Sequence, residues 1–276
     1  MKIALHQMRS GTDPSRNASA MAAAIADSAA NKAAFYFAPE MSLLLDRNRA
    51  RAKQHIRLEA DNPAIHVICK AAADAGIWVH IGSMPVVSEK DPTRFANRTL
   101  VIDSKGIIRA RYDKMHLFDV SLSSGESWRE SSAYAPGDLP TVVDTPFGLM
   151  GLTICYDMRF ADLYSLLGKA GSQFLAVPAA FTVPTGEAHW HTLLRARAIE
   201  SQAFVIAAAQ SGSHEDGRET YGHSLVVDPW GEVLLDMGEG VGLGFVDLNL
   251  DRMTEVKAQI PVQSNRRDIQ GHVKRY

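Results

Sequence analysis

The sequence has few cysteines, no excess charge of either sign and no long hydrophobic run. Two cysteines among 276 residues leave no disulfide framework, which favours a reducing compartment. The 29 Lys and Arg nearly balance the 31 Asp and Glu, so bulk charge favours neither nucleic acid nor an anionic membrane. Apolar runs such as 203–209 are too short to span a bilayer, and the N-terminal MKIALHQMRS lacks a secretory apolar stretch. We therefore expect a cytoplasmic protein with no nucleic-acid or membrane partner.

Motifs for metal and dinucleotide binding are missing as well. The chain contains neither HExxH nor a pair of CxxC motifs. His189 and His191 lie two residues apart in an expected helix, on nearly opposite faces, which makes them a poor metal pair. The glycine cluster at 240–244 lacks GxGxxG spacing and precedes an expected strand, which favours a turn. The sequence predicts no metal and no cofactor.

The composition that is present, 46% hydrophobic and 22% charged, is that of an ordinary globular protein rather than a disordered or collagen-like chain. Runs rich in β-branched and aromatic residues predict strands at 2–6, 34–38, 78–87, 99–103, 107–112, 151–155, 174–178, 203–209, 224–228, 233–236 and 243–249. Helical patterns occupy 17–32, 63–75, 160–170 and 188–202, the first with Asn17 as its cap. Interleaved helices and strands followed by hairpins predict one α/β domain over residues 1–276 with a mixed sheet. From about Pro261 the apolar density falls, so a tail is expected, either loose or packed on a partner.

The two cysteines lie in different sequence contexts. Cys69 is on the apolar face of the expected helix 63–75, which favours a buried core thiol. Cys155 ends the run GLTIC, immediately before an expected helix. A side chain on such a strand-to-helix turn is exposed, and backbone N–H groups at the helix start can stabilise a thiolate or an oxyanion. The spacing alone fits a nucleophile and a packed strand-end cysteine equally well.

Two charged residues follow expected strands. Glu40 comes directly after the apolar run 35–39, at a strand end where α/β folds bind ligands. Apolar surroundings would raise its pKa and suit it to general-base catalysis near neutral pH; the alternative is a solvated loop residue. Lys114 closes the expected strand 109–113 and could hold an oxyanion; the alternative is an ordinary surface lysine.

Taken together, four segments resemble the nitrilase superfamily of carbon–nitrogen hydrolases. They are FAPEMSL around Glu40, RYDKMHLFDV around Lys114, GLTICYDMRF around Cys155, and WRESSAYAPGD around Glu130. Glu, Lys and Cys in this order match the catalytic triad of the family, and Glu130 stands where the family carries a second glutamate. The resemblance extends from residue 2 to about residue 268.

The resemblance implies a four-layer α-β-β-α sandwich in a single domain, a homodimer or larger homo-oligomer, and hydrolysis through a thioester. Glu40 is then expected to take the proton of Cys155, with Lys114 favouring the thiolate. Lys114 and the backbone N–H of Tyr156 are expected to hold the oxyanion. Glu130 would orient Lys114 or the substrate.

Two further segments, AFTVPTGEAHWHTLLRARAIESQAFVIAAAQSG and YGHSLVVDPWGEVL, resemble the branch that contains deaminated-glutathione amidase and omega-amidase. This likeness implies a small carboxylate-bearing amide as substrate, with deaminated glutathione first. Arg159 and His189 are the candidate substrate-binding residues, because a guanidinium suits a carboxylate; a structural ion pair of Arg159 with Asp157 or Glu130 is equally compatible. Trp190 is expected to pack in the core.

Other functions remain open at this level. Within hydrolases, an omega-amide, an N-carbamoyl amine or a nitrile could replace deaminated glutathione as the substrate. Outside them, the same thioester could pass to a soluble amine, or the chain could be a non-catalytic binding module.

Overall fold

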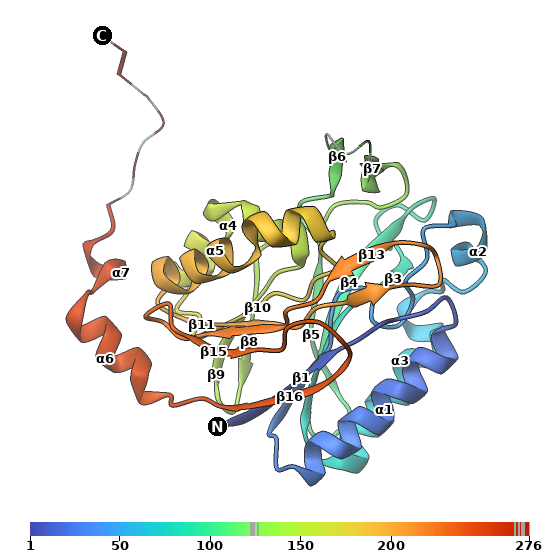
Figure 1. Ribbon diagram of the computed structural model, residues 1–276, viewed down its shortest axis with the longest axis horizontal. Coiled ribbons are helices and arrows are strands. Elements are labelled where there is room, and N and C mark those ends of the chain that lie inside the picture. The colour runs from blue at the N-terminus through green and yellow to red at the C-terminus, as the bar shows by residue number, and fades with distance from the viewer. Residues whose placement is uncertain (122–124, 126, 268, 270, 272–273, 276) are drawn as a thin grey trace.

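Two six-stranded β-sheets stack face to face between layers of helices in the computed structural model, which describes residues 1–121, 125, 127–267, 269, 271 and 274–275 (Figure 1). The first sheet has the strand order β16 (Gly242–Asp247), β1 (Lys2–Gln7), β2 (Phe35–Phe37), β3 (Trp78–Val87), β4 (Phe95–Ile102) and β5 (Ile108–Asp113). The second has the order β15 (Val233–Asp236), β14 (Leu225–Val227), β11 (Phe204–Ala207), β10 (Phe174–Ala176), β9 (Gly148–Leu152) and β8 (Thr141–Thr145). Two small hairpins pair β6 (Asp119–Ser121) with β7 (Ser127–Arg129) and β12 (Ser211–Ser213) with β13 (Glu219–Tyr221).

Both sheets are built on the same plan. Three parallel strands lie side by side in each, β1-β2-β3 in the first and β9-β10-β11 in the second. An antiparallel strand flanks each triplet on one side, and a pair of antiparallel strands flanks it on the other. Just past β1, Met8 bridges to Gln210, just past β11, so the carboxyl ends of the two triplets meet. Loops that follow β2, β9 and β10 therefore converge on one place.

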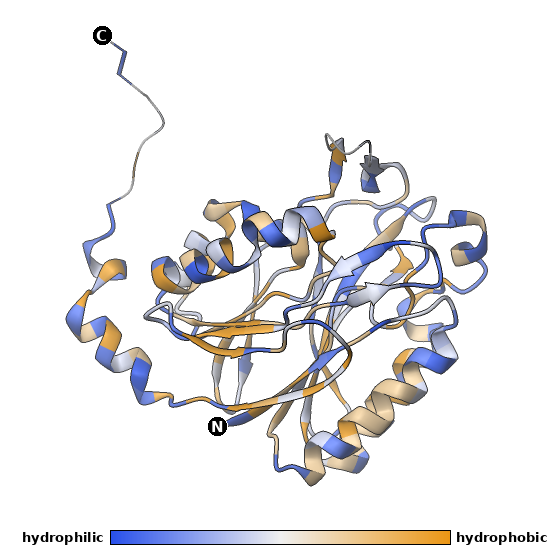
Figure 2. Ribbon diagram, viewed as in Figure 1, coloured by the Kyte–Doolittle hydropathy of each residue, from blue (hydrophilic) through white to orange (hydrophobic). Residues whose placement is uncertain are grey.

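Helices cover the outer face of each sheet. Helices α1 (Pro14–Ala30) and α3 (Pro63–Ala75) share a hydrophobic core with the first sheet, and α4 (Ala161–Lys169) and α5 (Val183–Ser201) pack on the second. The largest core lies between the sheets, where Figure 2 shows the strands to be mostly hydrophobic. The remaining helical segments are α2 (Arg49–Lys53), α6 (Asp251–Gln259), α7 (Val262–Asn265) and the 3-10 turns η1 (Glu59–Asp61), η2 (Glu130–Ser132) and η3 (Cys155–Arg159). The α-β-β-α sandwich expected from the family resemblance is confirmed.

Two helix starts differ from the sequence prediction. Helix α1 begins at Pro14, and the cap is Asp13, whose carboxylate accepts the N–H of Ser15 (2.8 Å). Asn17 was expected to be the cap but lies inside the helix, where its amide donates to Leu43 O (3.0 Å). Helix α5 begins at Val183 rather than at 188, because the following proline is tolerated in a first turn.

The segment from Pro261 packs in part on its own chain. Residues 262–265 form α7, and Gln263 Nε2 donates to Glu200 O of α5 (3.3 Å). The guanidinium of Arg266 donates to the hydroxyl of Ser165 in α4. Residues 268, 270, 272–273 and 276 of the expected tail lie outside the described residues. In the part of the chain that is described, no helix is long and apolar enough to cross a membrane.

His80 is a buried, uncharged group that makes stability depend on pH. It is 1% exposed in β3 beside Phe37, and neither ring nitrogen has a hydrogen-bond partner among the described residues. Burial lowers the pKa of His80 to about 3. In the unfolded chain a histidine has a pKa of about 6.5. Below that pH the unfolded state therefore binds a proton at His80 that the folded state does not bind, so the free energy of unfolding decreases as the pH drops below about 6.5.

We expect His80→Phe to remove this part of the acid sensitivity, about 2 kcal/mol between pH 6.5 and pH 5. Urea unfolding of both proteins at the two pH values measures the difference. His66→Gln, on the exposed side of α3, is the matched control. An equal loss of stability in His80→Phe and wild type would contradict the prediction.

Candidate active site

The loop that follows β2 holds Glu40 in a fixed, buried position, 4% exposed. Strand β3 passes so close that a Cβ on Gly82 would lie 2.0 Å from Ala38 O, so only glycine allows this approach. On the other side, the buried amide of Gln210 donates to Glu40 O (3.0 Å). Both sheets therefore fix the backbone that carries this carboxylate.

Lys114 follows β5 and lies between two carboxylates. Its Nζ donates to Glu40 Oε1 (2.8 Å) and to Glu130 Oε2 (3.0 Å). The lysine is 2% exposed. Glu130, in η2, is held in turn by the backbone N–H of Phe118 (2.7 Å). The three side chains form a carboxylate–ammonium–carboxylate array, in which Glu40 and Lys114 are buried and Glu130 is partly exposed. The order of the sequence motifs suggested this array but could not place it in space.

Asn97 completes this array, and sequence reasoning missed it. Its Nδ2 donates to Glu40 Oε1 (2.9 Å) and Glu130 Oε1 (3.3 Å), and the residue is 1% exposed. The strand predicted at 99–103 begins at Phe95 in the structure, so Asn97 lies inside β4 and not before it. Asn is disfavoured in strands, and its presence there would have been a signal had the strand been predicted from 95.

Cys155 is the first residue of η3, at the sharp turn that follows β9. Its φ of +49° is in the left-handed region, which a non-glycine residue adopts only when its surroundings enforce it. The backbone N–H donates to Pro178 O (2.9 Å), and the thiol is hydrogen-bonded to Glu40. The Ala180 N–H donates to the second oxygen of Glu40 (3.0 Å). Thiol, carboxylate and ammonium are thus in one connected set.

Asp157 fixes the turn on which the thiol is carried. Its buried carboxylate accepts the N–H of Ile154 (2.9 Å) and the hydroxyl of Tyr112 in β5 (2.7 Å). It also accepts from the backbone and ring of His116, two residues after Lys114. The Cys155 turn is therefore tied to the strand that delivers Lys114.

The protonation states follow from these contacts. Burial by itself would raise the pKa of Glu40, but the charge of Lys114 and the hydrogen bonds from Cys155, Lys114 and Asn97 hold that pKa below its usual value. Burial would lower the pKa of Lys114, and Glu130 and Glu40 outweigh it, so this pKa lies well above its usual value. The raised pKa expected for Glu40 from its apolar neighbours in sequence is wrong, because the expectation omitted the ammonium.

The thiol is protonated at rest. Burial raises the pKa of Cys155 well above its usual value, and the negative charge of Glu40 adds to the effect; the opposing influence of Lys114 is smaller. A preformed thiolate is therefore not the resting species. The arrangement is an ionised carboxylate hydrogen-bonded to a neutral thiol, which is a geometry suited to transfer of the thiol proton to the carboxylate.

These groups open into a cavity of about 920 Å³. Glu40, Lys114, Glu130 and Cys155 all line it. Its walls also carry aromatic rings and guanidinium groups, from Phe118, Trp128, Tyr134, Tyr156, Phe181, Arg47, Arg49, Arg51, Arg129 and Arg218. The site is large enough for a substrate well beyond the size of a simple primary amide.

The sequence model of one family, described as carbon-nitrogen hydrolase, matches residues 2–258. The chain belongs to the carbon–nitrogen hydrolase family. A deaminated glutathione amidase from Yersinia enterocolitica is 40% identical over 86% of this chain and 83% of its own. One from Homo sapiens is 36% identical over 98% and 84%.

Solved structures agree with this assignment. The Caenorhabditis elegans NitFhit protein superposes with a TM-score of 0.88 at 38% identity; the match covers 96% of this chain, which spans only 65% of that one. Saccharomyces cerevisiae Nit3, a member of the nitrilase superfamily, gives 0.87 at 26% identity over 97% of both chains. An amidase mutant from Nesterenkonia sp., with a TM-score of 0.79 at 26% identity over 95% and 98%, carries acrylamide added at its active site cysteine.

In this carbon–nitrogen hydrolase the structure separates the two candidate substrate-binding residues from the cavity. Arg159 Nη2 lies 3.2 Å from His189 Nδ1, and its guanidinium lies over the rings of Phe181 (5.5 Å) and Tyr156 (5.9 Å). Tyr156 and Phe181 line the cavity, but Arg159 and His189 are not among its lining residues. Their role in substrate binding stays a prediction.

The alternative prediction for Arg159 was a structural ion pair with Asp157 or Glu130. Within the described part of the chain, neither Asp157 nor Glu130 pairs with this arginine. Trp190 is 1% exposed and donates from Nε1 to His223 O (2.7 Å), which confirms the expected packing role.

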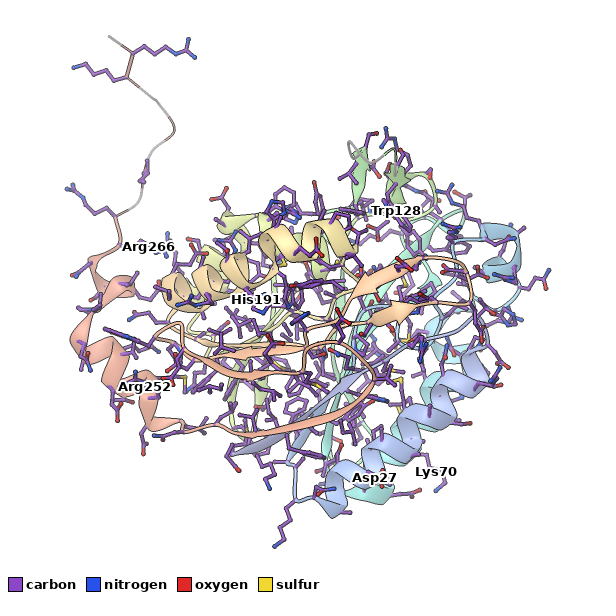
Figure 3. The ribbon with its side chains drawn as sticks, in the orientation of Figure 1. Asp27, Lys70, Trp128, His191, Arg252 and Arg266 are labelled. Atoms are coloured by element: carbon purple, nitrogen blue, oxygen red, sulfur yellow. The ribbon has the colours of Figure 1, made fainter. Side chains whose placement is uncertain are left out.

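A histidine–aspartate cluster lies away from this cavity. His191 Nε2 and His223 Nδ1 each lie 2.9 Å from an oxygen of Asp236, and the three ligand-type atoms are within 4.8 Å of one another. Figure 3 shows His191 projecting from α5 toward the second sheet. These side chains could hold a divalent cation, but none of them belongs to the carboxylate–ammonium–thiol site of the carbon–nitrogen hydrolase. His189 is not part of the cluster.

Proposed function

We propose that this carbon–nitrogen hydrolase cleaves the amide bond of a small carboxylate-bearing metabolite, deaminated glutathione, through a thioester on Cys155. The observation that carries the proposal is the ionised Glu40, hydrogen-bonded to both the Cys155 thiol and the Lys114 ammonium at the wall of a large cavity. Relatives that are 36% to 45% identical are named deaminated glutathione amidases, which supports the substrate.

The first half of the reaction forms the acyl-enzyme. Glu40 takes the proton from Cys155 Sγ as the sulfur bonds to the amide carbonyl carbon. The resulting oxyanion is held by Lys114 Nζ and the backbone N–H of Tyr156, the residue after the nucleophile. Glu40 then gives its proton to the amide nitrogen, the C–N bond breaks, and the amine leaves a thioester behind.

The second half releases the acid. Glu40, ionised again, takes a proton from water as the water oxygen attacks the thioester carbonyl. The C–S bond breaks, and the proton held by Glu40 returns to the sulfur. Glu130 and Asn97 act on this cycle indirectly, because their hydrogen bonds hold Lys114 and Glu40 in place.

Turnover of deaminated glutathione, measured as release of 2-oxoglutarate and cysteinylglycine, tests the proposal. We expect turnover by the wild-type enzyme and none by a Cys155→Ala blank. A folded wild-type enzyme that is alkylated at Cys155 but inactive on this compound would exclude the substrate. Product analysis with omega-amides, N-carbamoyl amines and nitriles, and an amine acceptor for acyl transfer, then identifies the alternative.

The enzyme is further proposed to be a cytoplasmic homodimer. Both cysteines are free, which fits a reducing compartment. Leu166 of α4 and Ile199 of α5 are 52% and 46% exposed, and Ile199 borders an apolar groove with Trp230 and Ile260. Docking of this helical face on a second copy would cover these side chains. Sedimentation of wild type against Ile199→Glu tests the interface; a monomeric wild type would exclude it.

A further inference from the structure

We propose that Arg47 binds a carboxylate of the substrate and thereby makes the cavity selective for anionic amides. The inference rests on the proposed amidase function and adds the residue that recognises the substrate's charge. Five arginines line the cavity, and the one that has no protein partner has its whole guanidinium available to a ligand.

Two of these arginines are occupied by carboxylates of the protein. Arg51 makes a two-point contact with Asp46 (2.6 and 2.9 Å). Arg218 pairs with Asp216 (2.9 Å) and lies 5.0 Å from the ring of Trp128. Both guanidinium groups are thereby neutralised and held in place.

Two more arginines donate to the backbone. Arg49 Nη2 donates to Arg129 O (2.8 Å). The guanidinium of Arg129 donates to Val120 O (3.0 Å), to Trp128 O (2.8 Å) and to Ser121 Oγ (3.2 Å). Through these hydrogen bonds, the guanidinium groups of Arg49 and Arg129 stabilise the β6–β7 hairpin.

Arg47 differs from the other four. Its backbone N–H donates to Asp216 Oδ2 (2.8 Å), which fixes the main chain. Among the described residues its guanidinium has no hydrogen bond, no carboxylate within 4.0 Å and no ring contact. Gly217 lies beside it, and a Cβ there would come 3.1 Å from Arg47 Nη2, so the glycine leaves the guanidinium room. A fixed backbone thus presents to the cavity a solvent-exposed guanidinium that has no protein partner among the described residues.

Nearby acidic groups do not satisfy this cation, since each has another partner. Asp46 and Asp216 are paired as above, and Glu215 accepts the N–H and the hydroxyl of Thr12 (3.0 Å each). A substrate carboxylate that enters the cavity can therefore bind the Arg47 guanidinium through two parallel N–H···O hydrogen bonds. Deaminated glutathione carries two carboxylates, whereas simple amides carry none.

The proposed carboxylate contact of Arg47 is linked to the proposed general base, Glu40, by their positions in the chain. Arg47 and Glu40 lie on the same connection between β2 and α2. A substrate carboxylate bound at Arg47 would therefore orient the substrate against the segment that carries the general base. Arg159, the candidate from sequence, has its guanidinium at His189 instead.

Three matched substrates test the proposal: deaminated glutathione, its analogue with a methyl ketone in place of the 2-oxo acid, and its analogue lacking the glycine carboxylate. We expect Arg47→Met to lower kcat/KM for deaminated glutathione roughly 10- to 150-fold, the range for hydrogen bonds to a charged group. For one of the two analogues the loss should shrink to less than about threefold, because the carboxylate that Arg47 binds is already missing. An equal loss on all three substrates, or no loss, would overturn the proposal.

Arg49→Met is the matched control for the electrostatic potential of the cavity, since it also removes one positive charge from the cavity wall. We expect it to lower kcat/KM for deaminated glutathione much less than Arg47→Met does. Equal effects of the two variants would assign the selectivity to net charge and count against a specific contact.

A second measurement does not depend on turnover. Binding of the two products, 2-oxoglutarate and cysteinylglycine, to Cys155→Ser protein is measured by calorimetry. The product whose carboxylate Arg47 contacts should bind roughly 30-fold more weakly when Arg47 is also replaced by Met. If the wild-type enzyme fails to cleave deaminated glutathione, the substrate assignment is wrong while this experiment still decides the role of Arg47. Unchanged affinity for both products in the double variant would remove Arg47 from carboxylate binding.

Discussion

Cys155→Ser is expected to lower kcat for amide hydrolysis by roughly 10⁴-fold or more, because nucleophile, base and oxyanion donors act as a unit. In the proposed mechanism the sulfur of Cys155 bonds to the carbonyl carbon, and the hydroxyl of serine is a much weaker nucleophile beside Glu40. The fold should be unaffected, since sulfur and oxygen differ little in size at this buried turn. Single-turnover kinetics measures the loss, and thermal unfolding checks the fold.

Cys69→Ser is the matched control for this prediction. Cys69 is half-buried on α3, and burial raises its pKa, so it is a poor nucleophile. We expect the Cys69 variant to keep its activity and to form one acrylamide adduct per chain, at Cys155. Activity retained in Cys155→Ser, or lost in Cys69→Ser, would show that the wrong thiol has been assigned.

Lys114→Met is expected to damage both stability and activity. The substitution leaves the buried carboxylate of Glu40 and the mostly buried carboxylate of Glu130 without the cation between them. Breaking a buried ion pair in this way typically costs about 3–5 kcal/mol, and the loss of the oxyanion donor costs a further factor of roughly 10² to 10³ in kcat. Urea unfolding and steady-state kinetics measure the two losses separately.

The double variant Lys114→Met/Glu130→Gln distinguishes the two effects. Removing the charge of Glu130 relieves the repulsion between carboxylates, so we expect part of the lost stability to return. Activity should not return, because the ammonium is still missing. A Lys114→Met protein as stable as wild type would mean that the array does not carry the charges assigned to it.

Much of the fold was predictable because its signals are local. The prediction for β3 matches its observed bounds, 78–87, since a long β-branched and aromatic run is enclosed by Gly76 and by charged residues. The start of α1 was missed because Asp13 and Asn17 are both good caps, and only the tertiary contact of Asn17 with Leu43 O decides between them. The stacking of two sheets came from the family resemblance, not from periodicity.

The site was predictable to the extent that its residues follow strands. Glu40, Lys114 and Cys155 each come just after one, and the structure brings them together. Asn97 and Arg47 escaped because their roles depend on contacts with distant segments, to Glu40 in one case and to Asp216 and Gly217 in the other. The direction of the Glu40 pKa shift failed for the same reason, since Lys114 is 74 residues away in the chain.

The face-to-face sheets have one more consequence for the chemistry. Glu40 and Lys114 follow strands of the first sheet, whereas Cys155 follows a strand of the second. The hydrogen bond between carboxylate and thiol therefore exists only when the two halves of the molecule are docked. A nascent or damaged chain with separated halves carries a cysteine that has no base beside it. Chemical competence is thus a property of the docked pair of sheets and not of either sheet alone.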